Sequence, residues 1–154
     1  MNLSPHFTLA EFTASTKAME LGIDNSLPDE LLDNARKTVE MLERIRAYLS
    51  KLADKDVPIK LTSGYRCLAL NAAVGGKGAS DHTRAQAADW VAPAFGTPYD
   101  ICKALAPQVS ALGIGQLIHE FGIWTHTSTR TPDGAANRVI TISSAGTALG
   151  IQRV

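Results

Sequence analysis

Two histidines and one aspartate most constrain the fold of this chain, because they can act together only if separate segments meet. His82 and Asp89 lie seven residues apart, and His126 comes much later in the sequence. Two imidazoles and one carboxylate suit Zn²⁺ and leave a fourth coordination position open for water. An open position is typical of a catalytic zinc site, whereas structural sites are usually closed by four protein ligands. The pattern therefore indicates metal-assisted hydrolysis.

Two predicted strands offer a way to bring these side chains together. Residues 87–91 are predicted as a buried strand, and His82 lies just before the turn that leads to it. Residues 124–128 are predicted as a second strand, in which side chains two positions apart point the same way. A hairpin-like return can therefore bring His82 to Asp89, with His126 supplied by a neighbouring strand. Spacing alone leaves an alternative open, since a single histidine or aspartate is more often a core, surface or capping residue.

Helix signals gather early in the chain and strand signals late, which predicts an α+β domain. We expect a small, mainly antiparallel sheet with the N-terminal helices packed on it. Residues 1–154 are interpreted as one domain, helical over about 1–55 and carrying the metal site over about 56–154. Helices are expected from Leu9, at 16–21, after Pro28, at 68–74 and from Pro98, and strands at 58–62, 87–91, 116–119, 124–128 and 139–143.

Two of these helices carry a clear apolar face. The helix after Pro28 is the longest, and its stripe has the three- and four-residue spacing of a packed helix. The helix from Pro98 is expected to continue to Leu112 and to end at Gly113. The stripe of the long helix consists of Leu31, Ala35, Val39, Leu42, Ile45, Leu49 and Leu52.

Composition excludes several classes of partner. Lys+Arg and Asp+Glu both number 15, so no basic excess favours nucleic acid. Cys67 and Cys102 fit no zinc spacing and are too few for a disulfide framework. No apolar run reaches membrane-spanning length, and the N-terminus has no signal-peptide pattern. We expect a soluble monomer that is made in the cytoplasm and does not insert into a membrane.

Three motifs resemble the zinc D-Ala-D-Ala carboxypeptidase family, whose zinc fold Hedgehog-type domains share. They are Ser63-Gly64-Tyr65-Arg66, Ser80-x-His82-x-x-Ala85-x-Ala87-x-Asp89 and Trp124-x-His126. Further runs are similar to compact, phage-associated peptidoglycan peptidases, and the likeness covers nearly the whole chain in the expected order. These runs are Phe7-Thr8-Leu9-x-Glu11-Phe12, Gly22-Ile23-Asp24-Asn25, Leu70-Asn71-x-x-Val74-Gly75-Gly76 and Gln116-Leu117-Ile118-x-Glu120-Phe121.

The resemblance implies that one Zn²⁺ is bound by His82, Asp89 and His126. It implies hydrolysis of peptide bonds in the stem peptide or cross-bridge of peptidoglycan by attack of zinc-bound water, as a carboxypeptidase or an endopeptidase of D,D or L,D type. Many members carry an acid three residues before the last histidine, where this chain has Ile123. Glu120 is therefore nominated as the general base. His119 is the alternative, although strand alternation points it away from Glu120.

The resemblance also gives Arg66 the role of binding a substrate carboxylate, which a planar guanidinium holds with two parallel hydrogen bonds. A structural salt bridge is the alternative. Ser63, Tyr65 and Ser80 are candidates for hydrogen bonds to substrate or to the ligands, and the two serines are equally typical of turns. Ala85 stands where the family usually has glycine, so it lacks easy access to a positive φ.

We therefore expect a zinc peptidase that resembles an endolysin. It would serve phage or prophage lysis after release to the cell wall, or act as a virion component. Two other classes remain open at this stage. One is a zinc-containing binding module without catalysis, which the absence of an acid at Ile123 favours. The other is a phage structural domain without metal.

Overall fold

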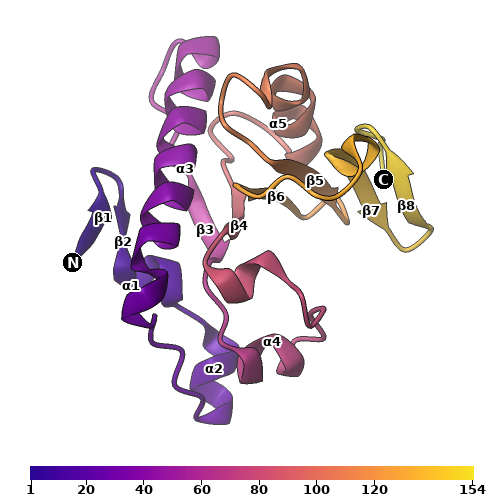
Figure 1. The fold of residues 1–154 in the computed structure, drawn as a ribbon. Helices are drawn as coiled ribbons and strands as arrows, with labels where there is room; N and C mark the ends of the chain where they lie inside the picture. The colour runs from indigo at the N-terminus through magenta and orange to yellow at the C-terminus, as the bar shows by residue number, and fades with distance from the viewer.

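The computed structural model describes residues 1–154 and shows an α+β fold, as the order of helix and strand signals predicts (Figure 1). A small two-stranded sheet at the N-terminus precedes the helices, and a six-stranded sheet forms the later part of the chain. The helices are α1 (Leu9–Thr13), α2 (Thr16–Leu21), α3 (Leu32–Ala53), α4 (Leu68–Ala73) and α5 (Pro98–Leu105), with 3₁₀ segments η1 (Asp29–Leu31), η2 (Asp81–Arg84), η3 (Ala106–Gln108) and η4 (Ala135–Asn137). The strands are β1 (Asn2–Ser4), β2 (Phe7–Thr8), β3 (Lys60–Ser63), β4 (Ala87–Val91), β5 (Gln116–Glu120), β6 (Trp124–Ser128), β7 (Val139–Ser143) and β8 (Gly146–Leu149).

The large sheet has the order β3-β4-β6-β5-β7-β8. Every neighbouring pair is antiparallel except β5 and β7, which are parallel. The expectation of a mainly antiparallel sheet is therefore confirmed. Strands β4 and β6 are direct neighbours at the centre, so residues far apart in the sequence are held at fixed register there.

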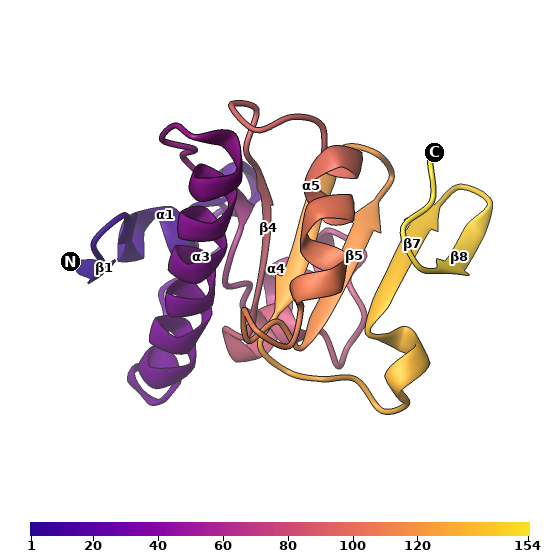
Figure 2. The same cartoon turned by 90° about the horizontal axis from the view of Figure 1, so that it is seen from above.

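Helices α3 and α5 cover one face of this sheet (Figure 2). The stripe on α3 is buried from Ala35 to Leu49 as its spacing predicts, although Leu52 near the end of the helix is exposed. Trp90 of β4 and Leu117 of β5 are fully buried in the same hydrophobic core. The core thus occupies the space between the sheet and these two helices.

The N-terminal helices begin and end where local capping chemistry predicts. Thr8 and Glu11 form a reciprocal capping box at the start of α1. Helix α2 ends at Gly22, which has a left-handed backbone with φ of 65°. The helix expected after Pro28 begins as the 3₁₀ segment η1 and continues into α3.

Three features of the fold differ from the sequence-based expectation. Helix α5 ends at Leu105 and does not reach Leu112, because Pro107 cannot donate to an α-helical ladder and a 3₁₀ turn takes over. Strand β8 was not predicted, since all its residues are exposed and show no alternation. Strands β1 and β2 were not predicted either, because they are too short to show a periodic signal.

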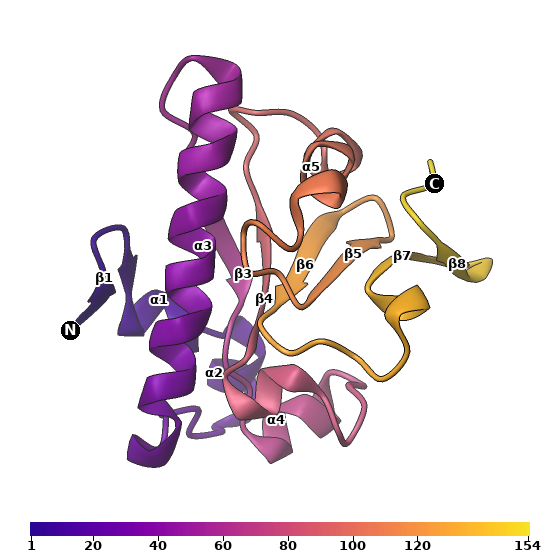
Figure 3. The same cartoon turned by 45° about the horizontal axis from the view of Figure 1, so that its top comes forward.

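The connection between β3 and β4 contains helix α4 and the 3₁₀ segment η2. Helix α4 and η2 pack against each other, and η2 also contacts β4. Figure 3 shows α4 at the end of the sheet, away from α5. None of the helices combines the length and the apolar character needed to cross a membrane.

Candidate metal centre

Asp89 and His126 are brought together by the ladder between β4 and β6. They are direct cross-strand partners, and the carboxylate Oδ1 of Asp89 lies 2.8 Å from Nδ1 of His126. Cross-strand partners share a face of the sheet. Their neighbours Trp90 and Thr127 point to the opposite face, where the Trp90 indole donates a hydrogen bond of 3.0 Å to the Thr127 hydroxyl. Strand alternation thus places the acid and the imidazole on the face that α3 and α5 leave uncovered.

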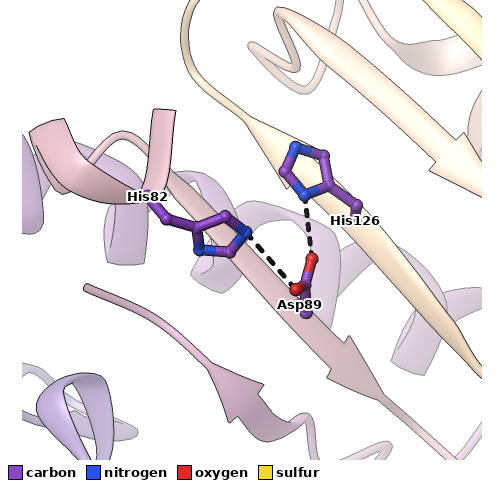
Figure 4. A group of neighbouring side chains, drawn as sticks. All are labelled: His82, Asp89 and His126. Carbon is purple, nitrogen blue, oxygen red and sulfur yellow. Dashed lines mark hydrogen bonds and ion pairs between the residues drawn. The ribbon is translucent and has the colours of Figure 1, made fainter. Parts of the chain in front are cut away.

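His82 reaches the same point from η2 (Figure 4). Its Nε2 lies 3.3 Å from Oδ2 of Asp89, and its Nδ1 lies 2.7 Å from the carbonyl oxygen of Gly64. A carbonyl oxygen only accepts hydrogen bonds, so Nδ1 carries the hydrogen and Nε2 of the neutral ring keeps its lone pair. A metal-binding histidine is usually oriented by such a bond from its other nitrogen.

Gly64 is required for this contact. A Cβ at this position would lie 2.3 Å from the carbonyl oxygen of Phe12, far inside contact distance. The same carbonyl accepts a hydrogen bond of 2.8 Å from the backbone N–H of Tyr65. Only glycine lets α1 approach β3 closely enough to set the carbonyl that orients His82.

The three side chains fit a small divalent ion. One ligand atom from each lies within 4.8 Å of the other two, and all three residues are buried. Tetrahedral Zn²⁺ with bonds of about 2.0–2.1 Å keeps its ligand atoms about 3.3 Å apart. The distance of 3.3 Å between His82 Nε2 and Asp89 Oδ2 matches that value. Two imidazole nitrogens and one carboxylate oxygen also form a donor set that leaves a coordination position for water.

Mutual attraction keeps this buried cluster charged. Burial alone raises the pKa of Asp89, but His82 and His126 outweigh burial and hold that pKa well below its usual value. Burial alone lowers the pKa of His126, whereas the hydrogen bond and charge of Asp89 raise it overall. Asp89 is thus an anionic group between two imidazoles, and a metal cation can take the place of the proton that Asp89 favours on His126.

Glu120 joins this cluster from the end of β5. Its Oε1 lies 3.7 Å from Nδ1 of His126. Burial raises the pKa of Glu120, and the nearby charge of Asp89 adds to this effect. His119 points to the opposite face, where its Nδ1 lies 3.0 Å from the carbonyl oxygen of Gln152. The structure therefore brings Glu120 to the candidate centre and places His119 away from it.

Ile123, at the position where the family resemblance leads us to expect an acid, lies in the turn between β5 and β6. Its side chain is 62% exposed, and its backbone N–H donates to the carbonyl of Glu120. In this chain the carboxylate that reaches the centre is therefore that of Glu120 on β5, the strand next to β6, which carries His126.

Arg66 follows β3 and lies near the same carboxylates. Burial lowers the pKa of Arg66, while the charges of Asp89 and Glu120 oppose that shift. Its buried Nε has no hydrogen-bond partner. A buried guanidinium donor without a partner is costly, so this atom is suited to an acceptor supplied by a ligand.

Asn25 fixes the backbone on both sides of Arg66, a role that its local sequence does not predict. Its Nδ2 donates to the carbonyl of Tyr65 over 3.0 Å, and its Oδ1 accepts from the N–H of Cys67 over 2.8 Å. Asn25 belongs to one of the runs that carry the family resemblance, which was the only available signal. A buried asparagine so far away in sequence gives no local pattern.

The remaining candidate residues occupy different environments. Ser63 of β3 pairs with Asp89 and is half-buried. Ser80 caps η2, because its Oγ accepts from the N–H of His82 over 3.3 Å. Tyr65 is 6% exposed and belongs to the hydrophobic core. The structure thus places Ser63 beside the ligand set, gives Ser80 a capping contact, and packs Tyr65 inside the molecule.

Ala85 ends η2 with a left-handed backbone, at φ of 57°. It is fully buried, and its carbonyl accepts a hydrogen bond of 2.8 Å from the hydroxyl of Thr38 on α3. Glycine, which the family resemblance leads us to expect here, would adopt this conformation without strain. The turn between His82 and Asp89 therefore contains one strained residue.

Two buried imidazoles, one from η2 and one from β6, face an aspartate of β4 with a glutamate beside them, and this arrangement defines the chain as a metallohydrolase candidate. The comparison with known families agrees with this description. The family model for Peptidase M15 matches residues 5–128, a span that includes all three candidate ligands, Glu120 and Arg66. The chain therefore belongs to the peptidase M15 family, whose members are metal-dependent peptidases. Among curated proteins, none matches the chain.

Proposed function

We propose that this protein is a zinc-dependent peptidase that hydrolyses peptide bonds of peptidoglycan. The observation that carries the proposal is the convergence of His82, Asp89 and His126, with their ligand atoms within 4.8 Å of one another. The family match supports a metallopeptidase. The choice of zinc rests on the donor set, since two imidazoles and one carboxylate in a buried site suit Zn²⁺ better than Mg²⁺ or Ca²⁺.

In the proposed mechanism, a zinc ion held by these three side chains would lower the pKa of a water ligand and polarise the scissile carbonyl. Glu120 accepts the proton from the attacking water and delivers it to the amine that leaves. Its position beside His126 and its raised pKa suit a group that must both take and release a proton.

Arg66 is proposed to bind a carboxylate of the stem peptide through its guanidinium, whose Nε has no hydrogen-bond partner within the chain. Ser63 lies opposite Asp89 and is proposed to donate a hydrogen bond to the same substrate. A carboxylate anchor suits cleavage close to a free carboxyl group, as in D,D- or L,D-peptidases acting on stem peptides or cross-bridges.

The biological setting that we propose is lysis of a bacterial host by a phage or prophage. This part rests on the resemblance to compact, phage-associated members over the runs around Phe7, Gly22, Asn71 and Gln116. The enzyme would act on the wall after release from the cell, or as part of a virion.

The role of Glu120 can be tested with purified peptidoglycan. Glu120→Gln should lower the rate at which new amino groups appear by about 100- to 10 000-fold, the usual contribution of a general base. Zinc content should remain at the wild-type level, because the variant keeps all three ligands. His119→Gln is the matched control, since it changes the neighbouring residue on the opposite face, and it should retain activity.

Other outcomes separate the remaining classes. Full activity in Glu120→Gln would show that another group accepts the proton. A wild-type protein that binds zinc and releases no amino groups would instead favour a binding module without catalysis. Mass spectrometry of the released muropeptides, with and without a chelator, identifies the bond that is cut.

A further inference from the structure

Asp89 and His126 are fixed to each other by a strand ladder, but His82 is not part of the sheet. It lies in η2, a 3₁₀ segment of four residues. The chain before η2 includes the glycines at 75, 76 and 78, which give it little intrinsic stiffness. The hydrogen bond between His82 and the Gly64 carbonyl orients the ring but does not reach β6, so another contact must tie η2 to the strand that carries His126.

An ion pair between Asp81 and Arg130 makes that contact. Asp81 immediately precedes His82, and Arg130 lies just beyond β6, four residues after His126. The Nε of Arg130 donates to Oδ1 of Asp81 over 2.6 Å. The Asp81 side chain is only 6% exposed, so this carboxylate needs its partner. The pair thus joins the segment that carries one histidine ligand to the segment that carries the other.

The backbone of Arg130 packs closely against Gly115. A Cβ on Gly115 would lie 2.3 Å from the carbonyl carbon of Arg130, so the two chains meet at a distance that only glycine permits. The N–H of Gly115 also donates to the carbonyl of Ser128 over 2.7 Å. Arg130 therefore offers Asp81 a fixed anchoring point.

A second connection runs through Gln86, in the turn that follows η2. Its N–H donates to the carbonyl of Asp81 over 3.0 Å, and its carbonyl accepts from the N–H of Thr129 over 2.9 Å. Both the side chain and the backbone of Asp81 are thus tied to the end of β6.

We propose that Asp81 and Arg130 form a positioning pair that holds His82 against Asp89 and His126 and thereby sets the affinity for the metal. The inference rests on the proposed zinc site and adds two residues that touch neither metal nor substrate. Residues that orient a metal ligand without touching the metal typically contribute 10- to 100-fold to metal affinity.

The test is a zinc titration of metal-free protein against a competing chelator. Arg130→Gln and Asp81→Asn should each weaken zinc binding by about 10- to 100-fold. The double variant should lose no more than about the larger single effect, because both substitutions break the same contact. Arg130→Lys keeps the charge but not the geometry of Nε, and it should show an intermediate loss even if the other variants fold poorly.

Arg84→Gln is the matched control. Arg84 carries the same charge and approaches the same Oδ1 of Asp81, but at 3.6 Å it makes no hydrogen bond, whereas Arg130 reaches that atom at 2.6 Å. A long ion pair without a hydrogen bond contributes little, so zinc affinity should change by less than about threefold. A merely structural role of Arg130 would lower the melting temperature of the metal-free protein and leave zinc affinity unchanged.

The two proposals can fail separately. Wild-type protein that binds zinc with the same affinity as well-folded Arg130→Gln would overturn the positioning pair alone. Wild-type protein that takes up no zinc would overturn the proposed function, and the positioning pair with it.

Discussion

The same strands form both faces of the six-stranded sheet, but one face carries apolar side chains and the other carries the candidate metal centre. On the face covered by α3 and α5, Trp90 and Leu117 are fully buried among apolar side chains. The adjacent residues of the same strands, Asp89 and Ile118, point to the other face, where the candidate metal ligands gather. A shift of one residue in either strand would exchange the two environments, so register determines both packing and chemistry.

Burial on the two faces is accompanied by different pKa shifts, as Cys102 and Asp89 show. Cys102 of α5 is buried on the core face, where burial raises the pKa of its thiol to about 12 and keeps it neutral. Asp89 is also buried, yet the imidazoles beside it hold its pKa well below the usual value. Burial alone therefore favours the neutral form, and a buried group stays ionised where partners of opposite charge and hydrogen bonds outweigh burial. We therefore predict that substitutions on the face of the candidate metal centre affect activity, whereas substitutions on the face covered by α3 and α5 affect stability.

The largest effect is expected at Asp89. Asp89→Asn keeps the shape of the side chain but removes the charge between the two imidazoles. We expect peptidase activity to fall at least about 1000-fold, because the loss of the metal removes several kcal/mol of transition-state stabilisation. The variant should still unfold cooperatively in the metal-free state. Activity within tenfold of wild type, measured by amine release from peptidoglycan, would break the proposed separation of the faces.

Leu117→Ala tests the core face. Leu117 is fully buried, and its truncation should lower the free energy of unfolding by about 3 kcal/mol. Leu149→Ala is the same substitution at a side chain that is 61% exposed, and it should change stability by less than about 0.5 kcal/mol. Urea denaturation measures both. Activity per folded molecule should be unchanged in Leu117→Ala, and a large loss there would show that the two faces are coupled.

The smallest effect concerns the strained turn between two candidate ligands, His82 and Asp89. Ala85 and Ala88 are both fully buried, but only Ala85 has a positive φ. Each change to glycine loses a buried methyl group, whereas Ala85→Gly also relieves about 1–2 kcal/mol of backbone strain. We expect Ala85→Gly to be more stable than Ala88→Gly by about that amount in denaturant unfolding. Equal losses in the two variants would show that the turn is not strained.

Much of the fold could be predicted because its signals are local. The capping box at Thr8, the left-handed end of α2 at Gly22 and the alternation in β6 each depend on a few neighbouring residues. Helix α5 ended early because Pro107 interrupts a pattern that apolar spacing alone would continue. Strand β8 could not be found, since its exposed residues carry no period.

Strand periodicity and the family motifs were enough to predict the candidate metal ligands, but not the residues that position them. The motifs named His82, Asp89 and His126, and the structure brings them together. The roles of Arg130 and Asn25 depend on contacts with residues 49 and about 40 positions away, which no local pattern records. Contacts of this length arise only when the whole chain has folded.

The most direct test of the account is the zinc content of the purified protein after dialysis against excess zinc and then against metal-free buffer. Elemental analysis should find one zinc ion per wild-type chain and essentially none in Asp89→Asn or His126→Ala. A well-folded wild-type protein that retains no zinc, or an Asp89→Asn variant that retains as much as wild type, would contradict the central claim that these side chains hold a metal ion.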